Sequence, residues 1–310
     1  MGGIFLRPPT SDLRPPTSLM NRIRPYLNLC KLGIVRMVGV TAAFSYLIAA
    51  PEVEGYGWMR LVASLIGIMG AAAGSAVLNN VIEKDLDGRM ERTRNRELPT
   101  GKVLPEHALG FGLVLCLGSV TWLVLTVNLL TAFLVLATAF LYVVVYTPLK
   151  TRTWLNTTIG AIPGAMPTLC GWSAAMNSLD FGAWVMFAIL FAWQHPHFYA
   201  IAWIYRDDYE KAGYKMLSVI DKTGARLFMQ VLLFSFFLLA VSLLPTLMDM
   251  SGWIYFAGAL ILGLYVMLAS FQFVARHTRK DARRLLFSTI VYLPALLLVI
   301  MADLGASRLF

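Results

Sequence analysis

Residues 61–87 read LVASLIGIMGAAAGSAVLNNVIEKDLD, an apolar run that passes directly into amides and carboxylates. About 20 apolar residues are enough for a helix to cross the hydrocarbon core of a bilayer. Gly70 and Gly74 lie one helical turn apart within the run, a spacing typical of closely packed membrane helices. The stretch therefore predicts a membrane-spanning helix with polar side chains at one end.

The rest of the 310-residue chain has the same character, because 58% of its residues are hydrophobic, 14% are charged and the mean hydropathy is +0.68. A soluble core of this size cannot hide so much apolar surface. We expect an all-α fold, a polytopic membrane bundle of nine transmembrane helices in one domain over residues 25–310, after a disordered cytoplasmic tail at 1–24, where proline pairs forbid a continuous helix. The nine apolar stretches lie at about 29–50, 61–82, 107–127, 129–149, 156–177, 182–204, 226–247, 252–275 and 285–303.

The basic residues indicate how the chain is oriented. Of the 26 lysines and arginines, 24 lie in the N-terminal region or in every second connection, and only Arg60 and Arg308 fall on the other side. By the positive-inside rule the N-terminus is cytoplasmic and the C-terminus is outside. The net charge of +9 then reports topology, and nucleic acid is not an expected partner.

Polar residues form a column at the end of the second stretch. Asn79, Glu83 and Asp87 are spaced i, i+4 and i+8, so on a helix they lie within roughly 80° of arc. An amide and two carboxylates suit a hard cation such as Mg²⁺, and the arginines that follow suit a diphosphate. These are Arg92, Arg94 and Arg96. The alternative is a solvated helix end with a ladder of charges.

A second polar cluster lies around the end of the sixth stretch. His195 and His197 flank Pro196 inside the predicted helix, and Asp207 and Asp208 follow at the membrane edge. Such groups are costly in lipid and should face the interior of the bundle. A functional role is favoured for His197 and left open for His195.

Several stretches of this sequence resemble the UbiA-type intramembrane prenyltransferases, which carry an N-x-x-x-D-x-x-x-D array and a second acidic motif. Within that superfamily the resemblance is greatest to the protohaem IX farnesyltransferases, or haem O synthases. The stretches that carry it are Asn79 to Asp87, Met90 to Arg96, Tyr146 to Lys150, Asn156 to Gly164, Pro167 to Trp172, Trp193 to Phe198 and Asp208 to Leu217.

The resemblance implies transfer of a farnesyl group from farnesyl diphosphate to a vinyl group of haem b, giving haem O for terminal oxidase biogenesis. It implies Mg²⁺ ligands at Asn79, Glu83, Asp87 and Asp208, diphosphate contacts from Arg92, Arg96, Lys150 and Arg206, and catalytic roles for Asp87, Arg92 and Lys150. Haem b, a substrate and no cofactor, would lie near Trp193, His197 and Tyr209. The implied setting is the inner membrane, with a cytoplasmic active site, the lipid bilayer as partner, and haem A synthase or oxidase assembly factors as candidate partners.

The sequence departs from the family pattern at three places. Glu83 stands where Asp is usual, Lys31-Leu-Gly33 replaces Lys-Pro-Arg, and Asp207 and Asp208 are adjacent instead of one turn apart. Two alternatives stay open: a UbiA-type enzyme acting on a quinone precursor or chlorin, and an ion-coupled secondary transporter. The transporter is disfavoured because its ionisable groups should lie near the midplane, whereas these acids gather at one surface.

Overall fold

The computed structural model describes residues 19–50 and 56–306, and in these ranges all regular secondary structure is helical. The helices are α1 (Leu19–Leu29), α2 (Leu32–Ala49), α3 (Tyr56–Ile82), α4 (Lys84–Asp87), α5 (Pro105–Thr126), α6 (Leu129–Phe140), the π-helical η1 (Leu141–Tyr146), α7 (Thr147–Leu149), α8 (Asn156–Met176), α9 (Phe181–Ile204), α10 (Arg206–Lys211), α11 (Leu217–Ile220), α12 (Ala225–Leu247), α13 (Trp253–Arg276) and α14 (Arg279–Ala306).

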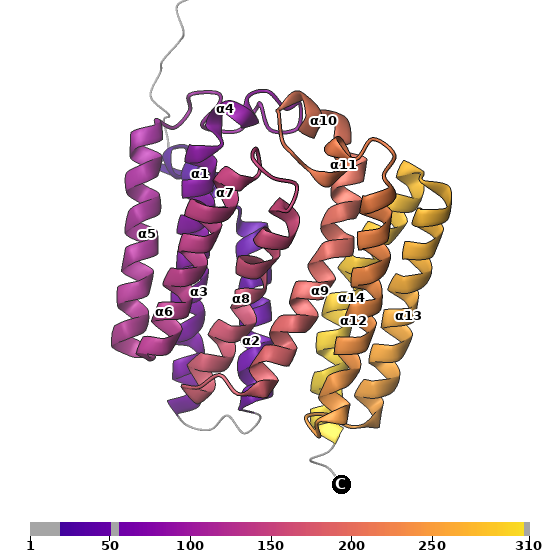
Figure 1. The fold of residues 1–310 in the computed structure, drawn as a ribbon. Coiled ribbons are helices and arrows are strands. Elements are labelled where there is room, and N and C mark those ends of the chain that lie inside the picture. Colours follow the sequence, from indigo (N-terminus) through magenta and orange to yellow (C-terminus); the bar gives the residue numbers. More distant parts are fainter. Residues whose placement is uncertain (1–18, 51–55, 307–310) are drawn as a thin grey trace, which may run out of the picture.

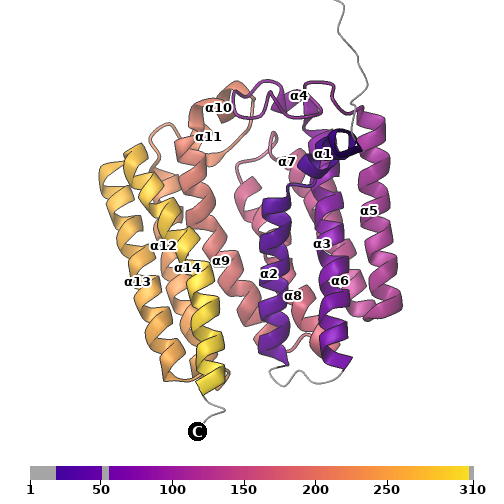
Figure 2. The ribbon, with the colours of Figure 1, turned by 180° about the vertical axis from the view of Figure 1, so that it is seen from behind.

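The long helices form two groups that stand side by side (Figures 1 and 2). In the first group α3 packs on α5, and α8 packs on α2 and α6. In the second, α12 packs on α9 and α13, and α14 packs on α13 and α9. Contacts between α8 and α9 join the two groups, so these two helices occupy the middle of the bundle.

The fold is that of a multi-pass membrane protein. Seven helical segments of the described chain are long and apolar enough to cross a membrane: α2, residues 57–82 of α3, α5, residues 129–149, α12, α13 and α14. Large apolar side chains such as Leu125 and Trp253 are more than three-quarters exposed, as expected of surfaces that face lipid.

The two central helices, α8 and α9, also coincide with predicted apolar stretches but are not among these seven. Both carry prolines inside the helix, and α9 buries the polar side chains of Gln194 and His195. Their central position explains the lower hydropathy, because protein surrounds them where lipid surrounds the outer helices.

The prediction for the N-terminal tail is corrected in part. Residues 1–18 lie outside the described residues, and α1 begins at Leu19, so the last part of the stretch predicted as tail, residues 19–24, is helical. Pro25 lies inside α1. The proline pairs at positions 8–9 and 15–16 precede this helix and leave it free to form.

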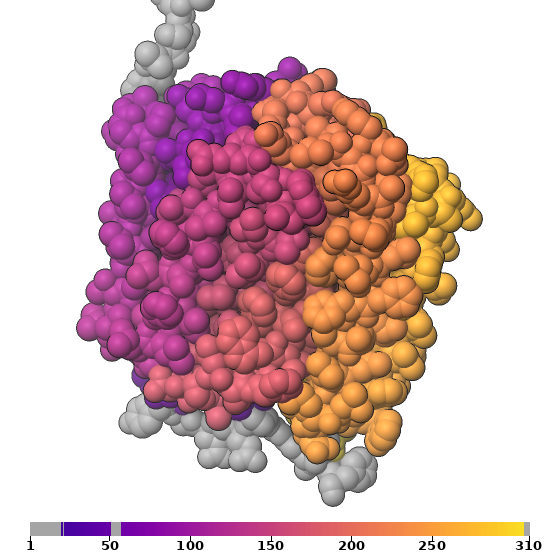
Figure 3. Space-filling view, in the orientation of Figure 1, coloured from indigo at the N-terminus to yellow at the C-terminus, as the bar shows by residue number. Residues whose placement is uncertain are grey.

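The connections that carry most of the charge lie at one end of the bundle, which we call the loop end (Figure 1). It consists of residues 83–104, 150–155 and 205–224, including α4, α10 and α11. Met90 from the first connection packs with buried Ala212 and Tyr214 from the third. This small apolar cluster ties two connections together that are more than a hundred residues apart in the chain, and Figure 3 shows them meeting.

Candidate active site

The predicted column lies at the loop end, where α3 passes into α4. The backbone N–H of Glu83 donates to the carbonyl of Asn79 at 2.9 Å, and that of Asp87 donates to the carbonyl of Glu83 at 2.8 Å. The helical path therefore continues across the junction and keeps the three side chains in register. All three are buried, with exposures of 1% for Asn79, 4% for Glu83 and 2% for Asp87.

Each side chain of the column has one oxygen that accepts a hydrogen bond from a cationic side chain. Lys31 Nζ lies 2.9 Å from Asn79 Oδ1, Lys150 Nζ lies 2.7 Å from Glu83 Oε1, and Arg96 Nη1 lies 2.8 Å from Asp87 Oδ2. Buried carboxylates are costly unless they are paired in this way. The column is therefore an array of oxygens built to face positive charge.

Glu83 accepts hydrogen bonds from two side chains, Lys150 and Tyr214. The Tyr214 hydroxyl donates to the same Oε1 atom at 3.2 Å, and the Lys150 ammonium lies 4.7 Å from the centre of the Tyr146 ring. Burial alone would raise the pKa of Glu83. However, the charge and hydrogen bond of Lys150, the charge of Lys31 and the hydrogen bond from Tyr214 together hold that pKa below its ordinary value. Glu83 is therefore ionised at neutral pH.

The shape of η1 and α8 allows this arrangement. The π-helical turn brings Tyr146 against α8 at Gly160, where a methyl group would overlap the tyrosine ring. Thr147, the next residue, accepts a hydrogen bond from the Asn79 amide at 3.0 Å. Gly160 thus makes room for the ring beneath Lys150.

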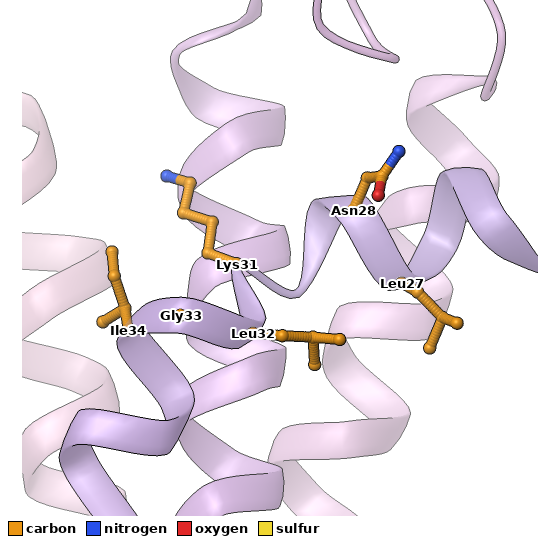
Figure 4. Close-up of a pocket in the computed structure, with 6 residues that line it drawn as sticks. All are labelled: Leu27, Asn28, Lys31, Leu32, Gly33 and Ile34. Carbon is orange, nitrogen blue, oxygen red and sulfur yellow. The ribbon is translucent and has the colours of Figure 1, made fainter.

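Lys31 comes to the column from the turn between α1 and α2. Figure 4 shows its side chain extending away from Leu27 and Leu32, in an open pocket of about 360 Å³. A smaller cavity of about 60 Å³, also bordered by Lys31, reaches Asp87 and Arg96. Burial, followed by the positive charges of Arg96 and Lys150, lowers the pKa of Lys31 to about 7.

Arg92 lies across the interface between the first and third connections. Its guanidinium carbon is 5.2 Å from the centre of the Tyr205 ring and 6.0 Å from that of Tyr209, so it stacks on aromatic faces beside α10. Arg206 lies elsewhere, 5.6 Å from the centre of the Trp203 ring. No contact in the described chain joins Arg206 to the column.

The second acidic pair is more open than the first. Asp207 forms an exposed ion pair with Arg279 at 2.6 Å, whereas the half-buried Asp208 has no side-chain partner among the described residues. Across residues 19–50 and 56–306 no three His, Cys, Asp or Glu side chains gather as a metal cluster. The structure therefore does not bring Asp208 into one group with Glu83 and Asp87.

The aromatic and histidine residues of α9 divide into two environments. His195 is fully buried and stacks on Phe234, with ring centres 3.4 Å apart. His197 and Trp193 stack on each other with centres 4.8 Å apart, and both bind Thr289 of α14. Tyr209 belongs to α10 at the loop end, where it packs edge-to-face on Tyr214.

A model of the UbiA prenyltransferase family matches residues 38–292 of the chain. The chain belongs to this family. Among curated UbiA relatives, a protoheme IX farnesyltransferase of Solibacter usitatus is 38% identical over 288 residues, covering 91% of this chain and 99% of the relative. One from Marinobacter nauticus is 41% identical over 286 residues, covering 90% and 92%.

Solved UbiA structures share the fold. A digeranylgeranylglyceryl phosphate synthase superimposes with a TM-score of 0.77 at 15% identity, over 92% of this chain and 99% of that one. A UbiA homolog from Archaeoglobus fulgidus bound to GPP and Mg²⁺ gives a TM-score of 0.62 at 14% identity, over 91% and 98%. At these identities the likeness establishes the architecture alone.

Four residues that contact the UbiA-type site residues were not predicted as part of the site from sequence. They are Lys31, Thr147, Tyr214 and Thr289. For Lys31 a signal existed, because a basic residue at the start of the first span can reach the neighbouring helix end. The others look ordinary in sequence, and only tertiary contacts single them out.

Proposed function

We propose that this UbiA-family prenyltransferase transfers the farnesyl group of farnesyl diphosphate to a vinyl group of haem b and so makes haem O for terminal oxidase biogenesis. One observation carries the proposal: the buried column Asn79-Glu83-Asp87, in which each side chain has one oxygen paired with a cation, in a chain about 40% identical to proteins named protoheme IX farnesyltransferase. The column suits a metal-bridged diphosphate, and the relatives' name gives the acceptor.

The donor set of the column fits Mg²⁺. The amide oxygen of Asn79 and the carboxylates of Glu83 and Asp87 are hard oxygen ligands, and each lies within 2.9 Å of a cationic nitrogen. Asp208, half-buried and without a side-chain partner among the described residues, would add a ligand from the third connection. Magnesium bound here would neutralise the diphosphate oxygens and so make diphosphate a better leaving group.

The protein's own cations would do the remaining electrostatic work. Lys150 and Arg96, now paired with the column, would turn to the diphosphate oxygens, and Arg92 of the first connection and Arg206 of the third would approach them as well. As the allylic C–O bond breaks, its electron pair leaves with the diphosphate, and these groups stabilise the growing negative charge. We assign catalytic roles to Asp87, Arg92 and Lys150.

The vinyl group of haem b then supplies the electron pair for the new C–C bond to the farnesyl C1. Water adds to the carbon beside the porphyrin ring and loses a proton, which gives the hydroxyethylfarnesyl product. Trp193, His197 and Tyr209 are the residues we assign to haem. Haem b is consumed in this reaction and is a substrate.

The layout of the chain supports a particular topology. With α8 and α9 counted beside the seven apolar segments, nine helices cross the bilayer, the N-terminus is cytoplasmic and the C-terminus is outside. The loop end then faces the cytoplasm at the inner membrane, and residues 25–310 act as one domain. Haem A synthase or oxidase assembly factors are natural recipients, because the product is insoluble in water and must be passed on.

The test uses the purified full chain with farnesyl diphosphate and Mg²⁺. We expect haem b to gain the mass of a farnesyl group plus a hydroxyl group, and the product to disappear when EDTA replaces Mg²⁺. A parallel reaction with 4-hydroxybenzoate tests the alternative that the acceptor is a quinone precursor, and a reaction with a chlorin tests the alternative that it is a chlorin. Prenylation of either of these with none of haem b would overturn the proposal.

A further inference from the structure

His197 has one ring nitrogen fixed by the protein and the other left without a partner. Its Nδ1 lies 2.9 Å from the hydroxyl of Thr289 on α14. No partner of Nε2 occurs in the described chain, and the side chain is only half-buried. An imidazole nitrogen without a partner in a membrane helix is costly, which indicates a functional role for this residue.

The Thr289 hydroxyl decides which nitrogen of His197 carries the proton. It lies 2.7 Å from the backbone carbonyl of Leu286, and a carbonyl oxygen can only accept. The single hydroxyl proton is therefore committed to Leu286, and the hydroxyl oxygen must accept from His197. The proton of the ring sits on Nδ1, and Nε2 carries a free lone pair.

The other three histidines of the chain do not share this arrangement. The Nδ1–H of His195 donates to the Phe191 carbonyl at 2.8 Å, which leaves Nε2 to accept from the Thr158 hydroxyl at 3.3 Å. His107 is exposed near the start of α5. His277 ends α13 with its ring stacked on Phe228.

Thr289 also fixes the neighbour of His197. The indole N–H of Trp193 donates to the Thr289 carbonyl at 2.7 Å, and the Trp193 and His197 rings stack with 24° between their planes. One fully buried residue thus orients a flat aromatic surface through its carbonyl and an imidazole through its hydroxyl. A histidine with one N–H bonded and the other nitrogen free is the usual form of a metal ligand.

Resting on the proposed function, we infer that His197 binds the iron of haem b through Nε2 as an axial ligand, with Thr289 as the positioning residue. His197 is seven residues from the end of α9 at Ile204, which places it roughly 10 Å below the loop end. Binding through iron holds the macrocycle without using its vinyl groups, so one of them stays free to meet the farnesyl chain.

The experiment is a titration of the purified full chain with haem b, in the absence of farnesyl diphosphate, followed by optical and electron paramagnetic resonance spectra. Wild type should give the spectrum of a histidine-ligated haem. His197→Ala should lose that spectrum and bind haem at least 10-fold more weakly, and added free imidazole should restore the nitrogen-ligated spectrum. His107→Ala is the matched control and should behave as wild type.

Thr289 provides a second, milder set of variants. Thr289→Val removes the hydroxyl but keeps the carbonyl that holds Trp193, and should weaken haem binding by roughly 10-fold. Thr289→Ser keeps the hydroxyl and should restore both affinity and spectrum. Equal spectra and affinities for wild type and His197→Ala would overturn the inference.

Product formation separates this inference from the proposed function. If wild type makes haem O and His197→Ala shows an unchanged haem spectrum, the iron ligand is assigned wrongly and the function stands. If wild type binds haem through His197 and forms no prenylated haem, the ligand stands and the function is wrong.

Discussion

The two acidic regions of the loop end differ in how deeply their carboxylates are buried and in how they are paired. In the first, Glu83 and Asp87 are almost fully buried, and each forms an ion pair, Glu83 with Lys150 and Asp87 with Arg96. In the second, Asp207 pairs with Arg279 at the surface, and Asp208 keeps a half-buried carboxylate without a side-chain partner among the described residues. Both regions lie at the same end of the bundle, yet only one is preorganised.

The difference indicates that the two regions have different roles in binding. Buried, paired carboxylates keep their geometry, because moving either partner alone would leave an uncompensated charge. A half-buried carboxylate that is not held in an ion pair can reorient at a lower cost, since water already solvates part of it. We expect the first region to set the position of the diphosphate and the second to close on it.

The largest effect should come from Asp87→Ala. This change removes a central oxygen of the column, so farnesyl transfer should fall by more than about 100-fold. The fold should survive, because the side chain of its partner Arg96 is already one-third exposed and can be hydrated. Product mass measures the loss, and size-exclusion chromatography in detergent checks the fold.

Asp85→Ala is the matched control for Asp87→Ala. Asp85 lies in the same short helix α4 but is exposed, whereas Asp87 is buried. The loss of Asp85 should leave transfer within about 2-fold of wild type, as is usual for surface positions. Full transfer by the Asp87 variant would remove the metal assignment.

How much of this contrast could be predicted from sequence depends on which contacts are local. The column follows from i, i+4 spacing, because one helix carries all three residues. Lys150 and Arg96 could be assigned to the same ligand by charge. Their pairing with Glu83 and Asp87 depends on how the first connection folds and on how it packs against the second. Tyr214 meets Glu83 across 131 positions of sequence, and no periodicity reveals such a contact.

Arg92→Ala should have the next largest effect. Arg92 stacks on Tyr205 and Tyr209 at the boundary of the two regions, so its charge can reach a diphosphate held between them. Losing one charge-assisted hydrogen bond should weaken farnesyl diphosphate binding by roughly 10-fold. Titrations with farnesyl diphosphate and with haem b should show loss for the first ligand alone.

Arg94→Ala serves as the comparison for Arg92→Ala, because Arg94 is equally exposed and has no aromatic partner among the described residues. It should bind both ligands as wild type does. Equal weakening of diphosphate and haem binding by Arg92→Ala would mean that Arg92 supports the structure.

The pair Asp208→Ala and Asp207→Ala tests whether the second region binds metal at all. Asp208 has no side-chain partner in the described part of the chain and can bind metal, so its loss should raise the Mg²⁺ concentration needed for half-maximal transfer by roughly 10-fold. Asp207 is engaged with Arg279, an exposed ion pair worth at most about 1 kcal/mol, and its loss should change little. The reverse order of effects would assign the metal contact to Asp207.

The smallest effect should come from Tyr214→Phe, which tests the link between the two regions. The substitution keeps the buried ring against Met90 and Ala212 and removes only the hydroxyl that donates to Glu83. A single hydrogen bond to a carboxylate that keeps its lysine partner should be worth about 1 kcal/mol, or roughly 5-fold in transfer rate. Tyr205→Phe, which leaves the ring beneath Arg92 in place, should have no effect on rate. If Tyr214→Phe also matched wild type, Lys150 alone would hold Glu83, and the third connection would contribute to the column through packing and not through polarity.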